Sequence, residues 1–320
     1  MEIFPGIHRI EAPLGRRYVA MYLILGDRGA LLVDTGVRDS VDVALVNYLD
    51  RLSMNPQDIS YVVSTHCDFD HVGGNAALRA RAPEAVFLCH ELDRYMAEDV
   101  ERVVDERYDE FWTTDGHRET PESRRYILDC AEATPFDRCV ENGETLDVGG
   151  RRVRVLHVPG HSDGHLAVLD ETSGSMCIGD AVLGRSVNNA DGSPAFPPTY
   201  RRLGPYLASI AALRGAALSA LLPAHYPVFR EDEIERFLGD SVSFTEDLDR
   251  ELRLSLPEHD EGMGTMDLVR MLSARLGTWD PEAGQNLVYP LVGHLEELQS
   301  QSSVRVTIDQ DGHRRWFWSE

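Results

Sequence analysis

Short apolar runs alternate with turns and with helically spaced segments over the first 230 residues of the chain. The runs rich in β-branched and aromatic residues, which predict strands, lie at 18–25, 30–33, 61–64, 145–148, 152–157, 166–169 and 176–178. The apolar spacing over 41–52 and 76–81 predicts helices between them. Strands interleaved with helices in this order predict an α/β fold in which sheets form a sandwich.

Two segments depart from this alternation. About residues 90–133 carry charged and aromatic side chains at helical spacing, with a break at Asp115-Gly116, and predict two inserted helices. They either form an amphipathic pair that packs on the core or cover a site as a lid. After Pro227, helical patterns at 231–254, 266–276 and 287–299 precede strand patterns at 304–308 and 314–318. We therefore predict a domain at 1–230, with the insertion, and a helical, winged-helix-like domain at 231–320.

Composition narrows the classes of partner. The net charge is −23, which speaks against nucleic acid, because binding to that backbone depends on basic side chains. All basic residues are arginine, so no lysine is present to form a Schiff base. The sequence has no apolar run as long as a membrane span. Its first residues lack the basic region followed by an apolar run that is typical of a signal peptide. We expect no membrane partner and a cytoplasmic location, and the sequence leaves a homodimer open.

The densest cluster of potential metal ligands follows the apolar run at 61–64. It contains His66, Asp68, Asp70 and His71. Alternate residues of an extended or turning segment point the same way, so the first three can converge while His71 turns in as a helix begins. Two histidines and two aspartates at this spacing favour a metal site over a chance surface cluster.

Three further potential ligands each follow an apolar strand pattern. They are His161 after Val158-Pro159-Gly160, Asp180 after Ile178-Gly179, and His225 after Leu222-Pro223-Ala224. Taken singly, Asp180 can cap a helix and either histidine can be a turn residue. Their repeated placement after strands indicates a shared metal site.

These motifs, preceded by Val33-Asp34-Thr35-Gly36, resemble the metallo-β-lactamase superfamily, in its glyoxalase II-like and lactonase-like branch. The resemblance covers about residues 1–230 and implies a four-layer αββα sandwich that acts as the catalytic domain. It implies that His66, Asp68 and His161 hold a first metal, that Asp70, His71 and His225 hold a second, and that Asp180 bridges them. Asp34 would fix the ligand loop by hydrogen bonds, and His165 is interpreted as structural.

Asp68 departs from the family pattern, in which most members carry histidine at that place. The third carboxylate makes the site one unit less positive than a site with two aspartates. Two divalent ions are expected, with zinc as the first choice and iron or manganese as alternatives favoured by harder ligands. On this argument, Asp68→His should shift the metal preference toward zinc.

The resemblance implies a metal-dependent hydrolase of a small-molecule ester, thioester or lactone, which a metal-bridged hydroxide attacks. Asp70 is a candidate proton relay. Arg185 and Tyr226, each near a ligand in the sequence, are candidate substrate contacts. The alternatives are an iron-dependent oxidoreductase of the persulfide dioxygenase or flavodiiron kind, a phosphodiesterase or ribonuclease, and a binding protein without catalysis.

Overall fold

Two β-sheets face each other at the centre of the protein. The computed structural model, which describes residues 1–319, has a seven-stranded sheet of order β1-β2-β3-β4-β5-β6-β7 and a five-stranded sheet of order β14-β11-β10-β9-β8. Tyr22 and Leu31 of the first sheet and Val168 and Leu222 of the second pack in one buried cluster between them. Apolar side chains that alternate along each strand produce this interior.

The strands of the two sheets are short and all come from the first 230 residues. The first sheet consists of β1 (Glu2–Phe4), β2 (Ile7–Leu14), β3 (Arg17–Gly26), β4 (Gly29–Val33), β5 (Ile59–Val63), β6 (Val86–Cys89) and β7 (Arg138–Cys139). The second consists of β8 (Thr145–Val148), β9 (Arg151–His157), β10 (Leu166–Asp170), β11 (Ser175–Gly179) and β14 (Ala220–Pro223). A separate pair joins β12 (Val187–Asn188) to β13 (Pro194–Phe196).

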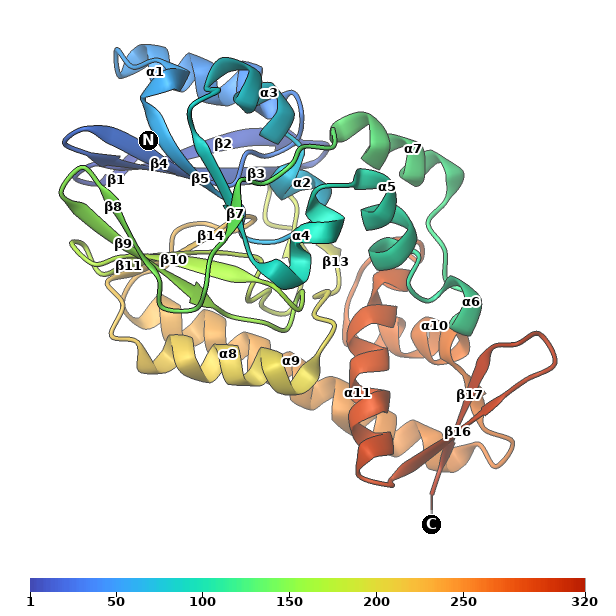
Figure 1. Cartoon of the computed structure of the whole chain (residues 1–320). Coiled ribbons are helices and arrows are strands. Elements are labelled where there is room, and N and C mark those ends of the chain that lie inside the picture. Colours follow the sequence, from blue (N-terminus) through green and yellow to red (C-terminus); the bar gives the residue numbers. More distant parts are fainter. Residues whose placement is uncertain (320) are drawn as a thin grey trace.

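Helices cover the outer face of each sheet (Figure 1). The turn η1 (Val41–Val46), α1 (Asn47–Arg51) and α3 (Asn75–Arg81) pack on the first sheet through Val41, Leu45, Leu49 and Leu78. On the second sheet lie α8 (Leu203–Gly215) and the start of α9 (Asp232–Ser255). The fold is thus an αββα sandwich, as the sequence predicts.

The C-terminal segment continues the outer layer of the second sheet. It contains α9, α10 (Thr265–Leu276) and α11 (Val288–Ser300), and a three-stranded sheet ordered β15 (Met263–Gly264), β17 (Arg314–Trp318), β16 (Val304–Ile308). Three helices followed by a terminal hairpin agree with a winged-helix-like extension. Leu291 and Trp316 share one apolar cluster with Ile178 and Leu221 of the second sheet, so the extension packs directly on the sandwich.

The insertion differs from the predicted pair of helices. It contains α4 (Glu91–Ala97), α5 (Val100–Arg102), the π-helical turn η3 (Val103–Tyr108), α6 (Trp112–Asp115) and α7 (Pro121–Cys130). The predicted break is present, because Gly116 adopts a φ of 75° where α6 ends. Helical spacing alone did not show the other breaks, since apolar residues keep nearly the same spacing across them.

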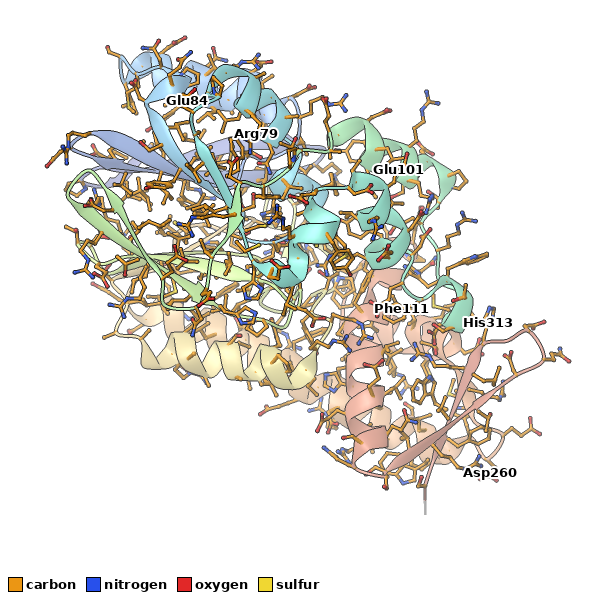
Figure 2. All side chains as sticks on the ribbon, viewed as in Figure 1. Arg79, Glu84, Glu101, Phe111, Asp260 and His313 are labelled. Carbon is orange, nitrogen blue, oxygen red and sulfur yellow. The ribbon has the colours of Figure 1, made fainter. Side chains whose placement is uncertain are left out.

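The C-terminal extension braces this insertion. Buried Asp115 accepts hydrogen bonds from Arg314, and Arg201 bridges Glu110 and Glu296 at 2.8 and 2.7 Å. Figure 2 shows Phe111 and His313 where the insertion meets the extension. The extension therefore fixes the position of the short helices.

Several elements had no clear sequence signal. The N-terminal strands β1 and β2 and helix α8 were not predicted, and neither was the short hairpin of β12 and β13 within the segment 184–200. Among residues 1–319, no helix is both long enough and apolar enough to cross a bilayer.

Candidate metal centre

The predicted ligands lie at one edge of the sandwich because they follow strands that run parallel. In the first sheet β4 pairs with β5 in parallel, and in the second β11 pairs with β14 in parallel. Parallel strands end at the same edge, so Asp34, His66, Asp180 and His225 emerge close together. Ala20 N donates to Ala224 O at 2.9 Å, which ties the two sheets together beside the site.

Two glycines are required directly before ligands. Gly160 has a φ of 140°, and a Cβ there would lie 2.4 Å from the backbone of Tyr206. Gly179 has a φ of 49°, and a Cβ there would lie 2.5 Å from Thr65 Oγ1. Positive φ values and close approach both favour glycine, so the chain can turn His161 and Asp180 inward.

The first position, defined by His66, Asp68 and His161, is compact and buried. Asp68 Oδ2 lies 3.2 Å from His66 Nε2 and 3.0 Å from His161 Nε2. The three ligand atoms lie within 4.8 Å of one another. The structure therefore brings together the three residues expected to hold the first metal.

The second position, defined by Asp70, His71 and His225, adjoins Asp180. His225 Nε2 lies 3.4 Å from both Asp70 Oδ2 and Asp180 Oδ2, and His71 Nε2 lies 3.7 Å from Asp180 Oδ1. Asp180 also groups with His66 and His71. It therefore lies between the two positions, where a bridging ligand is expected.

Three buried ligand atoms that face this space have no hydrogen-bond partner. They are His66 Nε2, His71 Nε2 and Asp180 Oδ1. Leaving buried polar atoms unpaired costs about 1–3 kcal/mol each, and native structures rarely do so without a ligand. Imidazole nitrogen and carboxylate oxygen are the donors that zinc, manganese and iron accept, so the residues present fit divalent metal ions.

The far nitrogens of three of these histidines are fixed by neighbours. His71 Nδ1 lies 2.8 Å from Asp34 Oδ2, His225 Nδ1 lies 2.8 Å from Tyr18 O, and His66 Nδ1 lies 3.0 Å from Thr65 Oγ1. Such partners set the tautomer and orient the ring for a metal. Asp34 also accepts from Thr65 N at 2.7 Å, which joins the ligand loop to β4.

His165 lies behind the ligands. Its ring stacks on His66 with centroids 4.7 Å apart, and its Nε2 accepts from the backbone N–H of Asp180 at 3.2 Å. That nitrogen is engaged by the protein, so the ring positions the ligand segment.

Ionisation differs between the two positions. Burial and the nearby His71 lower the pKa of His66 to about 3. Burial also disfavours charge on His71, but the carboxylates of Asp34 and Asp180 outweigh it and raise the pKa of His71 to about 10. Without metal, these surroundings favour the neutral form of His66 and the protonated form of His71.

One side chain that contacts the predicted ligands has no signal in the sequence analysis. Arg107, in η3 of the insertion, forms a buried two-pronged ion pair with Asp68, in which Nη2 donates to Oδ2 at 3.0 Å. Burial would raise the pKa of Asp68, but Arg107 outweighs it and holds that pKa well below its usual range. A third carboxylate in the ligand motif indicates that a cation lies nearby, but the sequence does not identify the arginine that supplies it.

A cavity of about 290 Å³ opens over the ligands. Its walls come from the first sheet, the insertion, the 184–200 segment and the extension, and they include Arg17, Phe69, Tyr108, Tyr126, Phe196 and Tyr289. The insertion thus covers the site, and Tyr289 OH donates to Tyr108 O at 3.0 Å to connect two of these walls.

The two predicted substrate contacts lie elsewhere. Arg185 pairs with Asp247 at 2.6 Å, and Tyr226 OH donates to the backbone oxygens of Leu183 and Ser186. Both line a separate groove beside α9 and neither lines the cavity over the ligands. This placement argues against the expected contacts, because nearness to a ligand in sequence does not fix the direction of a side chain.

The chain is similar to known proteins over most of the sandwich. The family model described as "Metallo-beta-lactamase superfamily" matches residues 14–225. An N-acyl homoserine lactonase of Bacillus sp. is 25% identical over 48% of this chain and 58% of its own length. A human acyl-coenzyme A thioesterase is 25% identical over 57% of this chain and 61% of its own length. The chain thus spans less than two thirds of these two relatives.

A solved structure covers almost the whole chain. A metallo-beta-lactamase family protein from Thermus thermophilus superimposes with a TM-score of 0.74 at 23% identity, over 99% of this chain and 100% of that one. At this identity the likeness shows the fold, including the extension. With the family model matching from β2 through His225, the chain belongs to the metallo-beta-lactamase superfamily.

Proposed function

We propose that this protein is a metal-dependent hydrolase that cleaves an ester, a thioester or a lactone. The observation that carries the proposal is the group of three unpartnered buried ligand atoms, on His66, His71 and Asp180, of which Asp180 lines the cavity. The names of two relatives, a lactonase and an acyl-coenzyme A thioesterase, support the substrate class. Zinc is the metal we expect first, with manganese and iron as alternatives.

Divalent metal held by these ligands would lower the pKa of bound water toward about 7 and polarise a carbonyl oxygen. The remaining work falls to the chain. His71 and His225 are held rigid by Asp34 and by Tyr18 O, which preorganises the ligand set. Asp70, which also lines the cavity, is suited to take a proton and deliver it to the leaving group.

The cavity walls select the substrate. Tyr108, Tyr126, Phe196 and Tyr289 offer aromatic surface on which an acyl chain or ring can pack. Arg17 places a cation at the same wall and lies over the Phe196 ring at 4.8 Å. We therefore expect a substrate with an apolar acyl part, oriented by contacts to the insertion.

The test is hydrolysis by the full-length chain after removal of metal with a chelator and reloading with Zn²⁺, Mn²⁺ or Fe²⁺. The substrates are an N-acyl homoserine lactone, an acyl thioester and a phosphodiester. We expect metal-dependent turnover of the lactone or the thioester, and we expect His225→Ala to lower it by at least about 100-fold. His259 is exposed, so His259→Ala should leave the turnover unchanged. Turnover of the phosphodiester alone, or oxygen uptake with a thiol persulfide and no hydrolysis, would overturn the proposal.

A further inference from the structure

Arg107 reaches from the insertion into the first position. Its side chain is only 11% exposed. Nε and Nη2 donate to the two oxygens of Asp68, Nη1 donates to His161 O at 3.3 Å, and Nη2 lies 3.0 Å from His161 Nε2. All three guanidinium nitrogens are thus directed at the residues expected to hold the first metal.

These contacts use the same atoms that a metal would need. Asp68 Oδ2 and His161 Nε2 are members of the ligand group, and both lie 3.0 Å from Arg107 Nη2. A nitrogen lone pair that faces an N–H donor is not available to a metal at the same time. The guanidinium also stays charged at all ordinary pH values, so it repels a divalent cation at contact distance.

In the part of the chain that the structure describes, no arginine competes with a metal in this way at the second position. Within residues 1–319, no hydrogen bond or ion pair joins an arginine to Asp70, His71, His225 or Asp180. The potential ligand atoms around it include His71 Nε2 and Asp180 Oδ1, which have no hydrogen-bond partner. The two halves of one ligand set therefore differ, because only the first has a guanidinium within hydrogen-bond distance of its ligand atoms.

The pair also changes the charge of the site. Asp68 with Arg107 is neutral in sum, as a histidine at that place would be. The site as a whole then has the charge of one with two aspartates. Because Arg107 neutralises the third carboxylate, the charge of Asp68 no longer favours iron or manganese over zinc.

We propose that Arg107 is a built-in cation at the first metal position, so that the protein binds one divalent ion tightly at the second position and another about tenfold more weakly or worse. The tight ion is held by Asp70, His71 and His225 with Asp180. The guanidinium, which lines the cavity, supplies positive charge to the substrate where the other ion would. This inference rests on the proposed metal-dependent function.

The test is a titration of the chelator-stripped, full-length protein with Zn²⁺, followed by calorimetry and by elemental analysis after dialysis. We expect one tightly bound ion per chain in the wild type. In the double variant Asp68→His with Arg107→Met, which is neutral at both places, we expect two, with the second bound about tenfold more tightly than in the wild type, or better.

The matched control is Arg124→Met. Arg124 pairs with Asp109 in the same insertion and forms no ion pair with a ligand, so its removal should leave the stoichiometry at one. Circular dichroism establishes that each variant is folded. If the double variant does not fold, the wild-type titration decides.

Two equally tight ions in the wild type, or no gain in the folded double variant, would overturn the inference and leave the hydrolase proposal intact. A wild type that binds no zinc, manganese or iron would overturn both.

Discussion

The first and second metal positions use the same kinds of ligand but have different surroundings. At the second position, Asp34 holds His71 and the carboxylates of Asp34 and Asp180 raise its pKa, so the site attracts positive charge. At the first, Arg107 already supplies that charge through Asp68. Ligand identity therefore does not decide metal affinity alone, because a protein cation within hydrogen-bond distance competes for the same oxygen and nitrogen atoms.

The largest effect is expected from Asp70→Asn compared with Asp68→Asn. Asp70 belongs to the position that we propose binds zinc tightly, so its replacement should remove bound zinc and lower kcat/KM by about 1000-fold or more. Asp68 is paired with Arg107, so the loss of kcat/KM in Asp68→Asn should be about tenfold smaller than in Asp70→Asn. Exposed Asp260, labelled in Figure 2, gives the control Asp260→Asn, which should change neither quantity. Equal losses in the first two variants would remove the distinction between the positions.

Next in size is the cost of breaking the ion pair. Asp68→His alone leaves Arg107 buried without its carboxylate and should lower the free energy of unfolding of the metal-free protein by about 3 kcal/mol. Urea unfolding in the presence of a chelator measures it. Adding Arg107→Met should recover most of the loss. If Asp68→His is as stable as the wild type, the ion pair does not stabilise the fold. The expectation that this variant shifts the metal preference toward zinc then stands.

A smaller effect is expected behind the second position. Asp34→Asn keeps the shape but removes the carboxylate that holds His71 Nδ1 at 2.8 Å. Loss of such a partner lowers metal affinity by about 10–100-fold. A competition assay with a chromogenic chelator gives the value. The exposed, matched variant Asp311→Asn should bind zinc like the wild type, and an unchanged affinity in Asp34→Asn would show that the hydrogen bond does not tune the ligand.

The smallest signal is the proton released by metal. At neutral pH, His71 with a pKa raised to about 10 holds a proton that the ion must displace, whereas His66 with a pKa lowered to about 3 holds none. Binding at the second position should therefore release about one proton. Affinity should rise with pH up to about 10, because fewer protons compete. Calorimetry in buffers with different ionisation enthalpies counts the protons, and a count of zero would place the tight ion elsewhere.

Regular strands were predictable where the apolar pattern was continuous. The runs near 18–25 and 166–169 become β3 and β10, in which the central residues of β3 and most residues of β10 are buried. The insertion was predicted less well. Its short helices break at Asp99 and Asp109, where side-chain hydrogen bonds cap or anchor the backbone, and such local contacts are weak in a pattern of apolar spacing.

The sequence by itself determined which residue types end which strands. The cluster from His66 to His71, with His161, Asp180 and His225, could be assembled without coordinates, because parallel strands bring their carboxyl ends to one edge. Only the tertiary structure decided that Arg107 joins Asp68 and that Arg185 and Tyr226 point away from the cavity. Arg107 and Asp68 are 39 residues apart, and no repeating pattern in the sequence relates them. Their contact depends on how the insertion packs, which the extension supports through the hydrogen bond from Tyr289 to Tyr108 O.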